Sequence, residues 1–293
     1  MHVSPASAAA RADLVAPAPL RAAAVALFTD LDGTLAPLQE RPGLVKPDAA
    51  RRRMLSRLQR ALDGRLAVVS GRGLEDLDRI LEHDVVAMSA AHGLVRRSAD
   101  GLVRGAARPR ALDDAREALE AFAKADRGLL LEDKGPAIAL HYRRSPGAAE
   151  ACQDVVRRLA IAGDLTVQQG DMVVELRAPG PDKGDAVRAF MAEAPFAGFM
   201  PVYIGDDLTD EHGFEAAAEL GGFGVIVGPR RPTAALYALP DVAAALAWMD
   251  AAAHADVARS AGPKPADDKT AGETTAEGTA EGTMEDRAGG ARA

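Results

Sequence analysis

The sequence predicts an α/β protein with a Rossmann-like parallel-sheet core and a smaller α+β domain inserted into it. Short apolar, β-rich runs alternate with amphipathic helical stretches in the early and the late part of the chain, which is typical of a parallel sheet flanked by helices. The middle of the chain instead repeats a helix followed by a hairpin, a pattern that does not extend a parallel sheet. With 293 residues, 48% of them hydrophobic, the chain can bury a core of this size.

The first part of the core is predicted from residue 21 to residue 104. Its strands are short apolar runs, as expected for parallel strands that are buried on both faces. Gly64 provides a stop signal for the first helix. The expected elements are a strand over 24–30, a helix over 48–63, a strand over 65–70, a helix over 73–81 and a strand over 85–89.

The inserted domain is predicted over residues 105–178. Two turn signals, Gly135-Pro136 and Gly170-Asp171, each separate two β-rich runs. The expected elements are a helix over 111–124, strands over 128–134 and 137–143, a helix over 146–160, and strands over 165–169 and 172–177. These two helix-plus-hairpin units form an α+β cap domain.

The core is expected to resume over residues 179–250. Its elements are a helix over 184–193, a strand over 201–205, a helix over 209–219 and a strand over 224–227. Residues 1–20 and 251–293 are rich in small residues and are expected to be disordered tails. They lack the bulky apolar side chains whose burial would offset the entropy of ordering.

The charge balance and the cysteine content exclude several classes of function. The chain has 35 basic and 43 acidic residues, a net charge of −8, which gives no attraction for nucleic acid or for anionic membranes. The apolar run over 22–28 is too short to cross a bilayer. A single cysteine, Cys152, excludes an intramolecular disulfide and a cysteine-based zinc site. We therefore expect a protein of the reducing cytoplasm that binds neither nucleic acid nor membranes.

Two carboxylates follow the first strand, in the segment Phe28-Thr29-Asp30-Leu31-Asp32-Gly33-Thr34. Residues two apart on an extended chain point the same way, and ligands of parallel sheets bind at the carboxyl ends of strands. Asp30 and Asp32 are therefore candidates for a paired acid site, and the following glycine permits a sharp turn around it. The alternative is an Asx turn with solvated carboxylates.

Three further polar segments fall at strand ends or helix starts. Ser70-Gly71-Arg72 offers a hydroxyl and backbone N–H groups to phosphate oxygens, or alternatively a helix N-cap. Lys183 opens a helix, where an ordinary surface lysine is the alternative. The segment 205–211 holds four acids in six residues, which repel one another unless they are solvated, protonated or bound to a cation. Carboxylate oxygens favour Mg²⁺, although acids are also common at helix N-termini.

In the order Asp-x-Asp, Ser, Lys, Asp-Asp, the four segments resemble the motifs of the haloacid dehalogenase superfamily of aspartyl phosphotransferases. The resemblance implies a hydrolase core in which Asp30 is the nucleophile and Asp32 the general acid and base. It implies Mg²⁺ held by Asp30, Asp206 and the backbone carbonyl of Asp32. The other implied site residues are Ser70 and Lys183 as catalytic groups, and Thr34, Gly71, Arg72, Asp207 and Asp210 as supporting groups.

The second acid distinguishes between reaction types within that superfamily. Ion-pumping relatives carry Asp-Lys-Thr at this place and keep their phosphoenzyme, whereas this chain has Asp32. The resemblance therefore favours hydrolysis or a mutase-type transfer over a transport ATPase.

The strands of the insert are expected to present one polar face. Residues two apart lie on the same face of a strand, which applies to Glu132 and Lys134 and also to His141 and Arg143. In the last strand, Glu175 lies on the face opposite to that of its apolar neighbours. Charged groups on a domain that closes over a phosphate site suit a polyhydroxylated sugar. The alternative is a face that is simply solvated.

Within the superfamily, the chain resembles the bacterial trehalose-6-phosphate phosphatases. The resemblance rests on the segments 131–143, 168–175, 190–196 and 205–211, together with Ala91-His92-Gly93. It implies a sugar-phosphate substrate and, as a partner, the synthase that makes trehalose 6-phosphate. The implied substrate contacts are Glu132, Lys134 and Glu175, and also His92, His141 and Arg143.

One position departs from the pattern of this family, and two other functions stay open. Asp171 stands where relatives commonly have lysine, which puts the affinity for substrate in doubt but not the core chemistry. The rival functions are a phosphatase for another sugar phosphate, such as sucrose 6-phosphate or mannosyl-3-phosphoglycerate, and a non-catalytic subunit. Pseudo-enzymes usually lose a catalytic acid or the lysine, and this chain keeps both.

Overall fold

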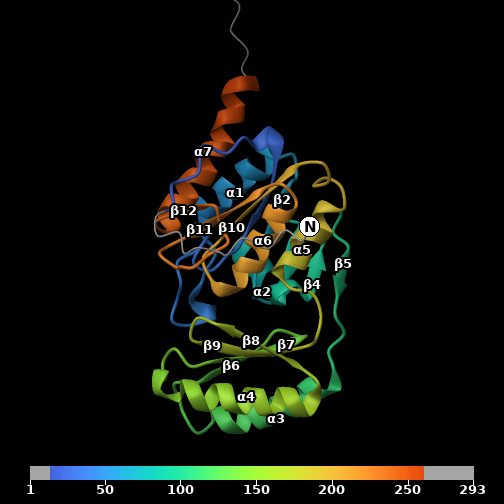
Figure 1. Cartoon of the computed structure of the whole chain (residues 1–293), viewed down its shortest axis with the longest axis vertical. Coiled ribbons are helices and arrows are strands. Elements are labelled where there is room, and N and C mark those ends of the chain that lie inside the picture. The colour runs from blue at the N-terminus through green and yellow to red at the C-terminus, as the bar shows by residue number, and fades with distance from the viewer. Residues whose placement is uncertain (1–13, 261–293) are drawn as a thin grey trace, which may run out of the picture. The chain divides into compact units, whose positions relative to one another are not determined.

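The computed structural model describes residues 14–260. The larger part of these residues is built on an eight-stranded sheet, which lies above the insert in Figure 1. The strand order is β12-β11-β10-β1-β2-β3-β4-β5. The strands from β12 to β3 run parallel, and β4 and β5 are antiparallel additions at one edge. The strands are β1 (Val25–Thr29), β2 (Leu66–Val69), β3 (Met88–Ala90), β4 (Val95–Arg97), β5 (Val103–Gly105), β10 (Met200–Gly205), β11 (Phe223–Val227) and β12 (Tyr237–Leu239).

Helices cover both faces of this sheet. Successive side chains of β1 point to opposite faces and belong to two separate apolar clusters. Val25 and Leu27 join the apolar cluster that includes α1 (Ala49–Ala61), α2 (Leu74–Leu81) and α7 (Val242–Ser260). Ala26 and Phe28 point to the other face, where they pack with α5 (Lys183–Met191) and α6 (Glu211–Glu219). Every residue of β1 is buried, as the apolar run in the sequence predicts.

The insert forms a separate four-stranded antiparallel sheet, ordered β6-β7-β9-β8. Its elements are α3 (Arg110–Ala123), β6 (Leu130–Asp133), β7 (Ala137–His141), α4 (Ala149–Gly163), β8 (Thr166–Gly170) and β9 (Val173–Arg177). Ile138, Leu140, Val174 and Leu176 pack against the two helices, which lie on the face away from the core (Figure 1). Residues of the opposite parity, Glu132 and Glu175 among them, therefore face the core.

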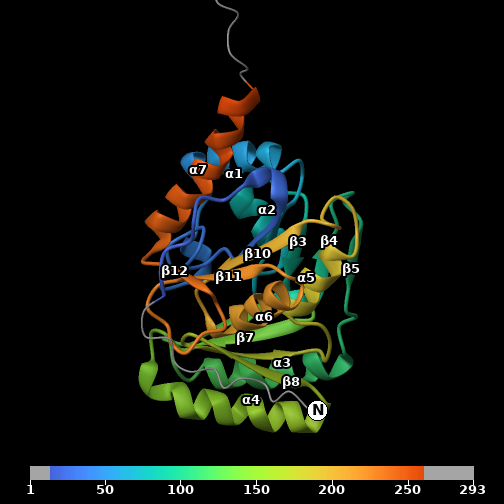
Figure 2. The same cartoon turned by 45° about the horizontal axis from the view of Figure 1, so that its top comes forward.

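The structure corrects the predicted start of the C-terminal tail. Residues 251–260 continue α7, which lies beside α1 (Figure 2). Ala252 and Ala253 are buried in the same apolar cluster as Met54 of α1. An alanine-rich helix buries little area per residue, but close packing against another helix compensates for the small side chains. The remainder of the predicted tail, 261–293, lies outside the described residues.

The predicted N-terminal tail is also too long. Leu20 is buried, the Ala18 carbonyl accepts a hydrogen bond of 2.9 Å from the Trp248 indole, and the Val15 carbonyl accepts one of 3.1 Å from the Ala238 amide. Residues 14–20 are thus fixed by contacts with the far end of the chain, which no local pattern encodes. Residues 1–13 lie outside the described part. Within residues 14–260, no helix is both long and apolar enough to cross a membrane.

Candidate active site

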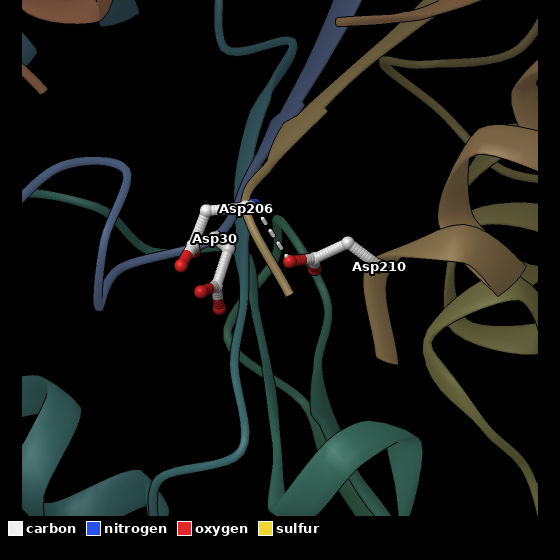
Figure 3. Close-up of side chains that lie close together, drawn as sticks. All are labelled: Asp30, Asp206 and Asp210. Carbon is white, nitrogen blue, oxygen red and sulfur yellow. Dashed lines mark hydrogen bonds between the residues drawn. The ribbon is translucent and has the colours of Figure 1, made fainter. Parts of the chain in front are cut away.

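The polar segments that follow β1, β2 and β10 meet at one edge of the core sheet. β1 lies between β10 and β2, and Thr29 pairs with Ile204, so Asp30 and Asp206 follow neighbouring strands. Figure 3 shows both carboxylates at these strand ends, with Asp210 approaching from the helical side. Carboxylate oxygens of the three residues lie within 4.8 Å of one another. The parallel sheet therefore brings together acids that are about 175 positions apart in the chain.

Gly33 allows the acids to approach this closely. Its φ of +83° lies in the left-handed region, and a Cβ at this position would be 2.1 Å from Oδ2 of Asp206. Any side chain here would displace the Asp206 carboxylate. Thr34, which follows in the same turn, is buried and donates a hydrogen bond of 3.3 Å to Oδ1 of Asp206.

Lys183 supplies a buried positive charge beside these acids. It is the first residue of α5, whose start is fixed by a capping box between Asp182 and Asp185. Its Nζ lies 2.7 Å from Oδ1 of Asp210 and 3.2 Å from Oδ1 of Asp30. Burial by itself lowers the pKa of Lys183, but the two carboxylates raise it above its ordinary value, so the lysine stays charged.

Asp210 has both oxygens engaged by protein donors. Oδ1 accepts hydrogen bonds from Lys183 and, at 2.8 Å, from the Tyr203 hydroxyl, and Oδ2 accepts the amides of Asp206 and Asp207 at 3.0 Å. The residue is completely buried. Asp210 therefore fixes the loop and the lysine, which leaves Asp30 and Asp206 as the carboxylates with capacity for a ligand.

Asp30 and Asp206 carry the clearest electrostatic sign of a cation site. Burial, together with neighbouring carboxylates, raises the pKa of Asp30 to about 7 and the pKa of Asp206 to about 9. Lys183 opposes both shifts without cancelling them. A divalent cation such as Mg²⁺ would favour the ionised form of both carboxyl groups, and carboxylate oxygens are the ligands it prefers. Coordination by the backbone carbonyl of Asp32 stays a prediction.

These raised pKa values predict that the metal-free protein loses stability as pH rises. The folded state keeps protons on Asp30 and Asp206 that the unfolded chain has released, so the free energy of unfolding falls between pH 3.8, the ordinary pKa, and about 9. Thermal unfolding in EDTA measures this, and added Mg²⁺ should raise Tm more at pH 8 than at pH 6. Asp206→Asn should flatten the pH dependence, and an unchanged slope in this variant would contradict the assignment.

The second acid, Asp32, lies in a fork formed by Arg72. Nε of Arg72 is 2.5 Å from Oδ2 of Asp32, and its second terminal nitrogen is 2.7 Å from Oδ1. Ser70 is buried, and its Oγ accepts a hydrogen bond of 3.3 Å from the Arg72 backbone amide. Gly71 leaves room for the His92 ring, which a Cβ would approach to 2.2 Å.

The polar face of the insert closes over these groups, and one cavity is lined by both domains. Lys134 and Glu175 form a buried ion pair, and His92 of the core lies 3.4 Å from the same carboxylate. His141 pairs with Glu132 at 2.8 Å. The predicted site residues that line the cavity are Asp30, Asp32, Ser70, Gly71, Arg72, His92, Glu132, Lys134, His141, Arg143, Glu175, Lys183, Asp206 and Asp207, whereas Thr34 and Asp210 do not line it.

Two buried polar atoms beside this cavity have no hydrogen-bond partner within residues 14–260. They are Oε2 of Glu175 and Nδ1 of His92. Burial raises the pKa of Glu175, but Lys134 and His92 outweigh it and hold the pKa well below the ordinary value. Burial also lowers the pKa of His92. An ionised carboxylate and a neutral imidazole with unused hydrogen-bonding capacity are suited to ligand hydroxyl groups.

Sequence reasoning missed the loop after β1 and the tyrosine behind Asp210. Residues 38–42 line the cavity. In the sequence, only their position in a loop between a strand and a helix, at the carboxyl end of the sheet, indicated that they could contact a ligand. Tyr203 is a hydroxyl-bearing residue in the otherwise apolar strand β10, and that polar group was its signal.

The chain is similar in sequence to several known proteins. The sequence profile of the family described as trehalose-phosphatase matches residues 28–243. A protein of Sinorhizobium fredii named probable trehalose-phosphate phosphatase is 39% identical over 222 residues, which cover 75% of this chain and 84% of that protein. The trehalose-6-phosphate phosphatase of Escherichia coli is 38% identical over 237 residues, covering 79% and 88%.

A solved structure shows the same fold. The C-terminal domain of the Candida albicans trehalose-6-phosphate phosphatase superposes with a TM-score of 0.71 at 22% identity, covering 83% of this chain and 99% of that one. The α/β fold class predicted from the sequence is thereby confirmed. Because the family profile spans most of the described residues, and because two relatives matched over more than four fifths of their length share more than a third of the aligned residues, the chain belongs to the trehalose-phosphatase family.

Proposed function

We propose that this chain hydrolyses trehalose 6-phosphate to trehalose and phosphate, with Mg²⁺ and through an aspartyl-phosphate on Asp30. The observation that carries the proposal is the shared cavity, in which Asp30 and Lys183 of the core meet Lys134 and Glu175 of the insert. The names of the two curated relatives support the same substrate.

In the first step, the Asp30 carboxylate attacks phosphorus and the bond between phosphorus and the sugar oxygen breaks. Asp32 donates a proton to that oxygen, which leaves as an alcohol. Lys183 and Ser70 line the cavity with Asp30, where their N–H and O–H groups would offset the repulsion between the phosphoryl dianion and the nucleophile. Mg²⁺, when bound, would add positive charge at the same oxygens.

In the second step, Asp32 takes a proton from water as the water oxygen attacks phosphorus. The bond between Asp30 and phosphorus breaks, which restores the carboxylate and releases phosphate. The insert covers the site, so that water is restricted while the sugar is bound.

The sugar would lie against the polar face of the insert. Glu132, paired with His141, and Glu175, paired with Lys134, offer acceptors for hydroxyl groups, and ionised carboxylates are strong acceptors. Asp171, which departs from the family pattern, pairs with Arg143 at 2.8 Å, and both residues line the cavity. We propose that Arg143 contributes positive charge there in this chain.

Glu132→Gln is expected to impair discrimination among sugar phosphates rather than the chemical step. Loss of one hydrogen bond to a charged group should lower kcat/KM for trehalose 6-phosphate by roughly 10- to 100-fold. Turnover of 4-nitrophenyl phosphate should stay within about threefold, because it has no sugar to contact. The matched control is Asp133→Asn, since this neighbouring acid pairs with Arg108 instead. An equal loss on both substrates would remove Glu132 from the sugar site.

Phosphate release from a panel of sugar phosphates, with and without Mg²⁺, tests the function directly. Trehalose 6-phosphate should give the highest kcat/KM. A preference for sucrose 6-phosphate or mannosyl-3-phosphoglycerate would support the rival phosphatase, and no release from any substrate would support a non-catalytic subunit. Association with a synthase and a cytoplasmic location stay predictions.

A further inference from the structure

The Arg72 side chain is bonded to three other parts of the protein beside the cavity. It is buried and donates to both oxygens of Asp32, to Asp76 of α2 and, at 3.1 Å, to the Pro42 carbonyl. Asp76 in turn pairs with Arg79, which reaches the Val45 carbonyl at 3.4 Å. Arg72 thus connects Asp32 to helix α2 and to the loop after β1.

The fork fixes the direction of the Asp32 carboxylate. Two parallel hydrogen bonds from one planar guanidinium restrain both the position and the plane of a carboxylate, which a single contact cannot do. The Asp32 side chain is 28% exposed at the cavity. Among the hydrogen bonds that the Asp32 carboxylate accepts within residues 14–260, both come from Arg72.

We propose that Arg72 is a positioning residue that holds Asp32 in line for proton transfer to the leaving oxygen. This inference rests on the proposed function, because it assigns Asp32 the role of general acid. A proton donor must lie within hydrogen-bond reach of the atom that it protonates, and an unrestrained aspartate samples several rotamers.

The donors of Arg72 argue against direct phosphate binding. A guanidinium has five N–H groups, and the four contacts to Asp32, Asp76 and Pro42 occupy four of them. A phosphoryl oxygen could bind Arg72 strongly only by displacing one of these carboxylates. Lys183 and Ser70, by contrast, face the cavity beside Asp30.

The two roles can be separated through the leaving group. A sugar alkoxide needs a proton as its bond to phosphorus breaks, whereas 4-nitrophenolate leaves without one. A residue that positions the acid therefore affects the first turnover of a sugar phosphate only. A residue that binds the phosphoryl group affects both substrates.

The experiment measures the first turnover by rapid quench for trehalose 6-phosphate and for 4-nitrophenyl phosphate. Arg72→Gln and Arg72→Lys are compared with Asp32→Asn, with Mg²⁺ saturating. Arg72→Gln should slow release of the sugar by about 100-fold, the scale of general acid catalysis, while nitrophenolate appears within about threefold of the wild-type rate. Arg72→Lys should resemble it, because an ammonium cannot form the fork.

A control variant separates positioning from loss of structure. Arg97→Gln removes a similar two-pronged pair, with Asp78, from strand β4 outside the cavity, and it should leave both first turnovers unchanged. Thermal unfolding is recorded for each variant, and Arg72→Lys keeps a buried positive charge if Arg72→Gln does not fold.

Three outcomes would overturn the inference. Equal slowing of both substrates would assign Arg72 to phosphate binding, and unchanged rates with both would deny it a role. If Asp32→Asn itself slowed both substrates equally, Asp32 would not be the general acid and the inference would fall with that assignment. Absence of turnover in the wild type would contradict the proposed function instead.

Discussion

Asp30→Asn is expected to lower kcat/KM for trehalose 6-phosphate by roughly four orders of magnitude or more. An amide cannot form the acyl phosphate, and loss of the nucleophile in other covalent enzymes has effects of this size. Phosphate release measured over hours, against the wild type at the same concentration, provides the measurement. Incubation with labelled substrate should also leave no phosphoryl group on the variant.

The fold of this variant should survive the substitution. Because burial raises the pKa of Asp30 to about 7, the carboxylate is costly to ionise in the native state, and replacing it removes that cost. Tm is therefore expected to stay at or above the wild-type value. Substantial turnover in a folded Asp30→Asn protein would remove Asp30 as the nucleophile.

Removal of divalent cations is expected to reduce turnover by roughly a thousandfold, the upper range for loss of one electrostatic group. Without a cation, the pKa of Asp30 stays at about 7, so much of the nucleophile is protonated at neutral pH. Exhaustive dialysis against EDTA followed by titration with Mg²⁺ measures the effect. Full activity after chelation would exclude a required metal.

Asp206→Asn tests where the metal binds. This variant should need at least about tenfold more Mg²⁺ for half-maximal activity, because it removes one of the two carboxylates that remain free to bind. Asp113→Asn, which alters an exposed acid on α3 of the insert, is the matched control and should leave the requirement unchanged. An unaltered requirement in Asp206→Asn would place the metal elsewhere.

The catalytic residues of the core domain could be predicted because each of them stands next to a recognisable pattern in the sequence. Asp30, Ser70 and Asp206 each follow a short apolar run of the kind typical of buried parallel strands, and parallel strands deliver their carboxyl ends to one edge. The polar face of the insert was predictable for the same reason, since strand parity is strict. The structure places Glu132 and Glu175 on that face, as the alternation indicates.

The antiparallel strands at the edge of the core were not predictable in this way. β4 and β5 have three residues each, and β5 is exposed along its whole length. So short a strand has no alternation to recognise, and it forms because β3 offers an open edge for pairing.

The sequence by itself determined the fold class, the order of the chemical groups along the chain and which strand or helix carries each of them. Only the tertiary structure decided which acid is free to bind a ligand and which is already bonded: Asp210 is saturated by Lys183, Tyr203 and two amides, whereas Asp206 is not. It also decided that Arg72 holds Asp32, that residues 14–20 contact the folded core, and that Ala252 and Ala253 are buried in it. These outcomes depend on partners far away in the chain, and periodicity reports the face on which a side chain lies but not the atoms it meets there.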